Sequence, residues 1–448
     1  MRWPTRGSGK RRSDGSVDIM IDVRAIETSM LDASLKGYPH RAPPCAVGAI
    51  ATRGWNVLRG DLPFPVALLK ETALAHNLSW MADFTRATGV LLAPHGKTTM
   101  APQLFARQLE AGAWGITFAT MQQVSLGVAA GLRRIILANQ LIGREDIAQA
   151  RDLLATIPEL ELHILVDSLA GLESLEAHGA PRGRDEPFSV LLEMGVPGGR
   201  TGCRTADEAM RLARAIAASP AARLAGVECF EGLSVTADDD ADRKTVDRWI
   251  HSLQQVARQC DVEGLYGTTQ VTLSAGGSAV FDLVARGLPM QLSRPVRTIL
   301  RSGCYVTHDS GFYERFLRHV ITRSGAPWRD REGLKPALEV WTQVQSRPEP
   351  GLAILAFGKR DASFDLELPA PFVRVREDGA RTPLDARYRI VKLNDQHAYM
   401  ELPVDADVRV GDLVGCGISH PCTTFDKWRW MPIVDDGYRV TAAIRTFF

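Results

Sequence analysis

The chain has no excess of charge of either sign, and this bounds the partners it can have. Its 448 residues include 53 lysines and arginines and 52 aspartates and glutamates, so the formal net charge is +1 at pH 7. Such a balance creates no broad electrostatic field that would attract nucleic acid or an acidic membrane. We therefore expect neither of them as a partner.

Apolar runs of membrane-spanning length are also missing, and cysteine is scarce. The uncharged stretch 264–281 is rich in Gly, Ser, Thr and Gln, which do not form a membrane span. The basic, Gly- and Ser-rich start has no signal-peptide core, so we expect 1–20 to be a disordered tail. Seven widely spaced cysteines without a CxxC motif are typical of a protein of the reducing cytoplasm.

Short apolar runs recur through the first three quarters of the chain. Their length and β-branched content are typical of strands that are buried on both faces. Helix-like segments alternate with them, and in one of these Thr205 and Glu208 have the spacing of a capping box. The eight runs occupy residues 89–93, 115–119, 134–139, 162–167, 189–194, 226–230, 270–275 and 297–303.

This alternation predicts an α/β fold, either a closed (β/α)8 TIM-type barrel or a doubly wound open sheet. We favour the barrel because most of the runs end in polar or glycine-rich residues. In a barrel all these ends converge on one face, where active sites form.

The pattern changes near residue 325, after which short alternating runs are separated by turn residues without long helical segments. This is typical of a mostly antiparallel β domain. The sequence thus predicts a barrel over 61–325 and a β domain over 326–448. We expect the segment 21–60 to add to the β domain.

A lysine follows the first apolar run directly, in the sequence "PHGKTT" (94–99). Lys97 is either a rim lysine that extends into water or a functional amine. A lysine held at a barrel mouth is partly desolvated, which lowers its pKa and favours a free amine able to form a Schiff base. Further along, the "GGS" of Gly276, Gly277 and Ser278 lies between an apolar run and a helix, where backbone amides can bind a phosphate.

The segment "APHGKTTMAPQLFARQLEAGAWGITFAT" resembles the family of D-serine dehydratases and D-threonine aldolases. The resemblance runs from about residue 55 to the C-terminus and includes "GVPGGRTGC" (195–203), "SAGGSAVFD" (274–282) and "GCYVTHD" (303–309). It implies the alanine racemase-like fold of pyridoxal-phosphate (PLP) enzymes of fold type III, and a homodimer.

The resemblance also implies site residues. Lys97 would carry the cofactor as its Schiff-base lysine and then act as general base. The other implied cofactor-binding residues are His95, Arg200 near the phenolic oxygen, Gly276, Gly277, Ser278 and Tyr305. Phe230 departs from the family, because members often carry a tyrosine there whose hydroxyl a phenyl ring cannot replace.

His420 and Cys422 lie two residues apart in "SHPCTTF", so in an extended segment both side chains point to one side and could bind one metal ion. Coincidence is the alternative, since His-x-Cys supplies only two ligands. A thiolate favours zinc, a soft ion. The context resembles the D-serine dehydratase branch, in which the pair binds zinc, whereas the aldolase branch carries an aspartate at the second position.

The sequence therefore predicts a PLP- and zinc-dependent dehydratase that converts a D-β-hydroxy amino acid, such as D-serine, to a 2-keto acid and ammonia. Zinc on His420 and Cys422 would act as Lewis acid for the leaving hydroxyl. A D-threonine or 3-hydroxyaspartate aldolase is the main alternative. An amino-acid racemase, which needs no metal pair, and a non-catalytic PLP-binding protein are further alternatives.

Overall fold

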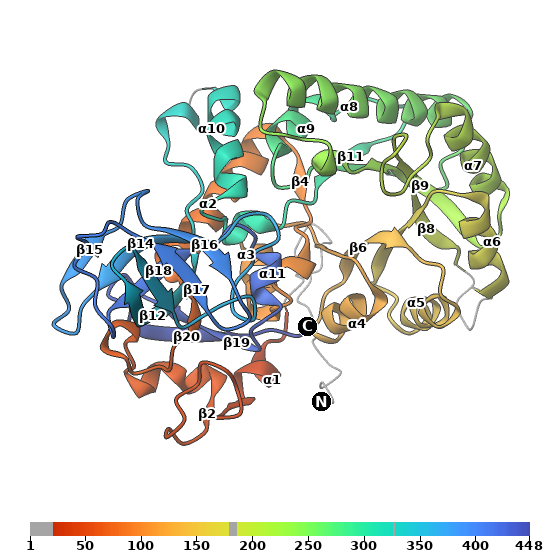
Figure 1. Cartoon of the computed structure of the whole chain (residues 1–448). Helices are drawn as coiled ribbons and strands as arrows, with labels where there is room; N and C mark the ends of the chain where they lie inside the picture. The colour runs from red at the N-terminus through yellow and green to blue at the C-terminus, as the bar shows by residue number, and fades with distance from the viewer. Residues whose placement is uncertain (1–20, 179–185, 326–327) are drawn as a thin grey trace.

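The computed structural model describes residues 21–178, 186–325 and 328–448 (Figure 1). The basic tail expected over 1–20 lies outside these residues. A barrel of parallel strands ringed by helices forms one side of the protein, and a β domain forms the other. This arrangement confirms the fold class that the sequence predicts.

The barrel strands coincide with the eight apolar runs. All pair in parallel, in the order β4-β11-β10-β9-β8-β7-β6-β5. A parallel bridge between His95 and Thr117 joins the ends of this order, so the sheet curls into a barrel. The strands are β4 (Leu91–Leu92), β5 (Ile116–Phe118), β6 (Arg134–Gln140), β7 (Glu161–Val166), β8 (Phe188–Met194), β9 (Ala222–Cys229), β10 (Val271–Ala275) and β11 (Val296–Leu300).

Amphipathic helices cover the outside of the barrel. In α7 the Thr205 side chain accepts from the backbone N–H of Glu208, and the Glu208 carboxylate accepts in return from the cap, which confirms the capping box. The helices are α2 (Glu71–Thr88), α3 (Pro102–Glu110), α4 (Met121–Ala129), α5 (Arg144–Thr156), α6 (Leu169–His178), α7 (Ala206–Ala218), α8 (Asp239–Val262), α9 (Phe281–Gly287) and α10 (Phe312–Ser324).

The β domain is a ten-stranded sheet in which all pairs but one are antiparallel. Its central path runs β15-β14-β18-β12-β13-β17-β16, while β19 pairs with β20 and β3. The short helix α11 (Cys422–Phe425) precedes β19. The strands are β3 (Val66–Lys70), β12 (Leu338–Glu349), β13 (Leu352–Leu355), β14 (Ala370–Val375), β15 (Arg381–Pro383), β16 (Arg389–Leu393), β17 (Ala398–Glu401), β18 (Leu413–Gly417), β19 (Trp430–Val434) and β20 (Val440–Arg445).

One strand lies in a different domain from the one its position suggested. Strand β3 (Val66–Lys70) falls inside the range 61–325 assigned to the barrel, yet it pairs with β12 and β19 of the β domain. Its apolar run is buried, and such a run does not indicate which sheet a strand joins. The chain therefore enters the barrel only at α2, immediately after it leaves the β-domain sheet.

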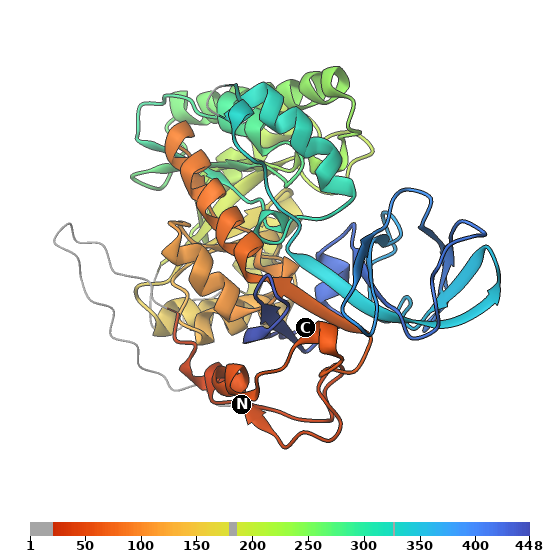
Figure 2. The same cartoon turned by 90° about the vertical axis from the view of Figure 1, so that its left-hand side faces the viewer.

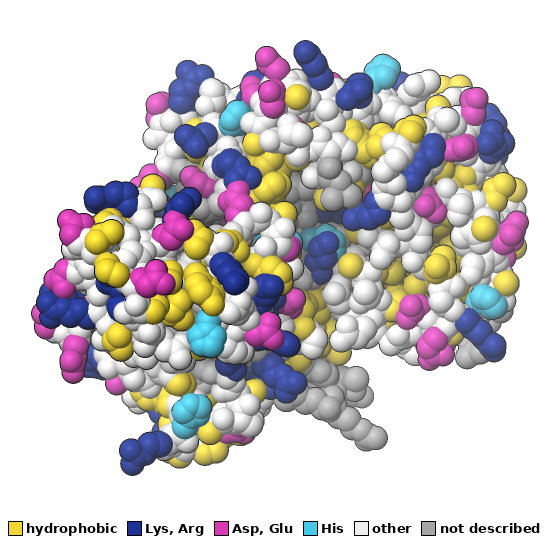
Figure 3. Space-filling model, in the orientation of Figure 1, with side chains coloured by type: hydrophobic (Ala, Val, Ile, Leu, Met, Phe, Trp, Pro, Cys, Tyr) yellow, Lys and Arg dark blue, Asp and Glu magenta, His cyan; other side chains and the backbone are white. Residues whose placement is uncertain are grey.

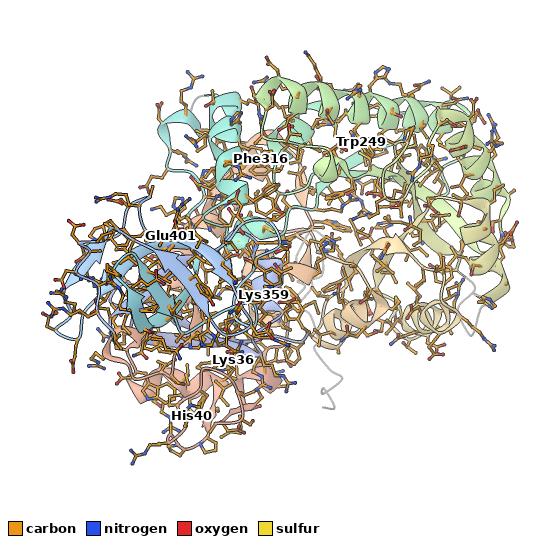
Figure 4. The ribbon with its side chains drawn as sticks, in the orientation of Figure 1. Lys36, His40, Trp249, Phe316, Lys359 and Glu401 are labelled. Carbon is orange, nitrogen blue, oxygen red and sulfur yellow. The ribbon has the colours of Figure 1, made fainter. Side chains whose placement is uncertain are left out.

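The segment 21–60 packs under the β domain (Figure 2). It contains α1 (Arg24–Glu27), the paired strands β1 (Met30–Leu31) and β2 (Cys45–Ala46), and the 3-10 turns η1 (Val47–Arg53) and η2 (Val57–Arg59). Lys36, labelled in Figure 4, connects this segment to the β domain. Its Nζ donates to the Arg360 carbonyl over 2.8 Å and lies 3.8 Å from the ring centroid of Trp428.

Within the described ranges no helix is long and apolar enough to cross a membrane. All seven cysteines are free thiols.

Candidate active site

Lys97 lies at the mouth of the barrel. It belongs to the 3-10 turn η3 (Gly96–Thr98), which directly follows β4. A side chain at position 96 would clash, because its Cβ would stand 2.6 Å from the Phe118 ring, so a glycine lets the turn lie against the barrel. The Lys97 side chain is exposed, and its ammonium group forms no hydrogen bond or ion pair with the described residues.

Cations surround His95, two residues before this lysine. Burial, and then the positive charges of Lys97 and Arg301, hold the pKa of His95 well below its ordinary value, so the imidazole is neutral. Arg200 contributes to the same effect, and its guanidinium lies 5.1 Å from the ring centroid of Phe230. The structure thus brings together three of the predicted site residues, with Arg301 as an additional cation. In the space-filling view, basic and histidine side chains are visible in the hollow between the two domains (Figure 3).

His420 and Cys422, the pair predicted to bind a metal, face this mouth from the β domain. Cys422 Sγ lies 3.5 Å from Oγ1 of Thr98, the residue after Lys97. His420 is oriented by Asp365, whose Oδ2 lies 2.6 Å from Nδ1 of the ring, and this contact leaves Nε2 for another partner. Lys97 and the His-x-Cys pair, 323 residues apart in sequence at their nearest, therefore both lie beside Thr98 at the boundary between the domains.

Comparison with known proteins identifies the family. The family model for the alanine racemase N-terminal domain matches residues 69–295, and the model named "Putative serine dehydratase domain" matches residues 337–434. The chain belongs to the D-serine dehydratase and D-threonine aldolase family, with an alanine racemase N-terminal domain.

This chain is similar to family members that have different activities. A 3-hydroxy-D-aspartate aldolase of Paracoccus denitrificans is 24% identical over 383 residues, which cover 84% of this chain and 90% of that protein. A D-threo-3-hydroxyaspartate dehydratase of a Delftia species is 29% identical over 246 residues, 51% of this chain and 63% of that one. The crystal structure of D-threonine aldolase from Filomicrobium marinum superposes with a TM-score of 0.72 at 22% identity, covering 88% and 96% of the two chains.

The glycines predicted to bind the cofactor phosphate already hold an anion. The backbone N–H groups of Gly276 and Gly277 donate to the two carboxylate oxygens of Glu231, over 3.1 and 2.7 Å. Glu231 is buried, so a phosphate could reach these two amides only by displacing its side chain. Ser278 is also engaged, because its Oγ accepts from the backbone N–H of Cys304 over 3.1 Å.

The fit to PLP is thus good at the lysine and poor at these two amides. Lys97 has no hydrogen-bond or ion-pair partner among the described residues, so its side chain is available to a cofactor. Gly276 and Gly277, by contrast, cannot donate to a phosphate while Glu231 holds them. Tyr305 is buried, and it interacts with Gln108 of α3.

A buried ion pair at the same end of the barrel was not anticipated from the sequence. Nη1 of Arg301 donates to Oε2 of Glu228, and both side chains are almost fully buried. Burial raises the pKa of Glu228 to about 7, Arg301 opposes this rise, and Glu193 on the neighbouring strand adds to it. The sequence does carry a sign of this pair, because Arg301 is a charged residue at the end of an apolar run, in "TILRSG".

The metal pair has a third neighbour that sequence reasoning also missed. Cys304 Sγ lies 3.8 Å from Cys422 Sγ. Hydrogen bonds from Cys304 and His420 lower the pKa of the Cys422 thiol well below its ordinary value, which favours its thiolate form. No three His, Cys, Asp or Glu side chains are already grouped to hold a metal in the part of the chain that the structure describes. His420 and Cys422 nevertheless have the donor chemistry of a two-ligand zinc site.

A cavity of about 360 Å³ lies at the other end of the barrel strands. Its lining includes Arg151, Glu161 and Arg297, and none of the predicted site residues. Because barrel active sites form at the carboxyl ends of the strands, we do not assign the chemistry to it.

Proposed function

We propose that the chain is a PLP- and zinc-dependent lyase that removes water from a D-β-hydroxy amino acid and yields a 2-keto acid and ammonia. The observation that carries the proposal is the meeting of Lys97 with the pair His420 and Cys422. An amine and a soft-metal donor set belong to different domains, and both lie beside Thr98.

PLP, when bound, withdraws electrons from the Cα of the substrate. The Lys97 amine would take the Cα proton as general base. His420 and Cys422 would hold zinc, which supplies a Lewis acid for the leaving hydroxyl. Asp365 fixes the tautomer and the direction of the His420 ring. Burial, and then the charges of Lys97 and Arg301, lower the pKa of His95, so that His95 does not add a further charge beside Lys97.

The dehydratase is favoured over an aldolase by the chemistry of Cys422, because a thiolate selects zinc over harder ions such as manganese or magnesium. The aldolase remains the second candidate, since the aldolase from Paracoccus denitrificans aligns with most of this chain. Both reactions use a β-hydroxy amino acid, and they differ in the bond that breaks.

Product analysis tests the proposal. Purified protein loaded with PLP and zinc is incubated with D- and L-serine, D- and L-threonine and the isomers of 3-hydroxyaspartate. We expect ammonia and a keto acid from a D-substrate. Chelation should abolish the reaction while the visible absorbance of bound cofactor stays, and zinc should restore it. Glycine and an aldehyde as main products would establish the aldolase instead, and full activity without metal would refute the metal role.

A further inference from the structure

The feature that the proposed function leaves unused is Cys304. It begins the 3-10 turn η5 (Cys304–Val306) in the barrel, whereas Cys422 begins α11 in the β domain. Their sulfurs are 3.8 Å apart, and no other two of the seven cysteines are in such contact within the described chain. The backbone of Cys304 is fixed by the hydrogen bond from its N–H to Ser278, so the approach of the two thiols is set by the fold.

The distance between the sulfurs has a chemical meaning. Two thiolates bound to one tetrahedral zinc ion, each at about 2.3 Å, stand about 3.8 Å from each other. The pair Cys304 and Cys422 therefore already has the separation of one edge of a tetrahedral zinc site. The sulfurs also share a polar neighbour, since Oγ1 of Thr98 lies 3.5 Å from Cys422 Sγ and 4.0 Å from Cys304 Sγ.

His420 is the candidate for a further ligand beside the two sulfurs. Its ring interacts with Cys422, and Asp365 engages Nδ1, which leaves Nε2 as the coordinating atom. The three side chains do not yet surround one point in the described residues. To complete the set, the imidazole of His420 would turn toward the two sulfurs, whose separation already suits one zinc ion.

We propose that Cys304 is a third protein ligand of the metal, so that zinc is held by Cys304, His420 and Cys422. This inference rests on the proposed metal role of His420 and Cys422 and adds a residue from the barrel to it. A tetrahedral ion with three protein ligands keeps one open position, whereas a two-ligand site keeps two. The substrate would then bind zinc through one atom only, the β-hydroxyl that leaves, and its carboxylate would be bound by protein groups.

The sulfur ligands can be counted without an activity assay. Zinc-loaded holoenzyme is prepared under argon, and X-ray absorption at the zinc edge gives the sulfurs per metal. We expect two sulfurs in the unmodified protein and one in Cys304→Ser. Zinc affinity should fall in the variant by at least the ~10–100-fold that loss of an outer partner costs. Zinc binding should also release one proton fewer, because the Cys304 thiol no longer ionises.

Cys45→Ser is the matched control, since Cys45 and Cys304 are each 5% exposed and Cys45 lies in the N-terminal segment. It should keep two sulfurs per zinc and the same proton release. One sulfur per zinc in the unmodified protein would overturn the role of Cys304 and leave the proposed function standing. A protein that binds no zinc and keeps full activity would overturn both. The count on the unmodified protein decides the question even if Cys304→Ser does not fold.

Discussion

The buried Glu228 should make the stability of the protein depend on pH, and Glu228→Gln should remove this dependence. Burial raises the pKa of Glu228 from its ordinary value of 4.5 to about 7, despite the nearby Arg301. Between these two pH values the folded protein keeps a proton on Glu228 that the unfolded chain has lost. Stability from the neutral carboxyl is thus fully present below pH 4.5 and is lost as the pH rises to 7.

The difference of about 2.5 pH units, at about 1.4 kcal/mol per unit, corresponds to about 3 kcal/mol. Glutamine carries no proton that titrates in this range. We therefore expect the free energy of unfolding of the unmodified protein, minus that of Glu228→Gln, to fall by about 3 kcal/mol from pH 4.5 to 7.5.

Urea unfolding followed by tryptophan fluorescence at a series of pH values measures this difference. Glu110→Gln, which removes an exposed carboxylate on α3, controls for the loss of one negative charge. A difference that stays constant with pH would refute the reasoning, because it would mean that Glu228 is equally ionised in the folded and unfolded chains.

Three further predictions concern the site. Lys97→Ala should abolish turnover and the visible absorbance of bound cofactor, because no other described barrel strand is followed directly by a lysine. Absorbance and product assays check this. Chelation should remove activity but leave that absorbance, since the metal pair and Lys97 lie on different domains. Gly303→Ala should lower stability by about 1–3 kcal/mol and weaken cofactor binding, because a Cβ there would stand 2.6 Å from the His95 carbonyl oxygen. Gly351→Ala, whose Cβ would meet no atom within 3.6 Å, should leave a thermal melt and a cofactor titration unchanged.

The sequence predicts those parts of the fold that depend on local patterns of residues. Each of the eight apolar runs is a barrel strand, because a run of this length between helices indicates a strand buried on both faces. The polar ends of the runs favoured the barrel over an open sheet. The capping box at Thr205 is likewise a local arrangement of hydrogen bonds. Strand β3 was assigned to the other domain, because pairing with β12 is a long-range choice that its own residues do not encode.

Contacts across the barrel mouth explain what sequence reasoning missed in the site. Glu231 directly follows Phe230, and its hydrogen bonds with Gly276 and Gly277 join residues 45 or more positions apart. Asp365 lies 55 residues before His420 in a segment with no other sign of function. Only the folded chain shows that two expected phosphate donors are occupied and that one metal ligand is oriented.

The site depends on how the two domains pack, and this follows from the route of the chain. Strand β3 is held in the β-domain sheet by β12 and β19, and α2 of the barrel begins at the next residue. No flexible linker separates the domains at this crossing, so a shift of the β domain would be transmitted directly to the barrel. The contact of Cys422 with Thr98 and Cys304 spans the same boundary from the other side. A metal ion bound there would therefore stabilise the domain arrangement as well as the reaction, and zinc should raise the melting temperature of the protein by the usual linkage of binding to folding.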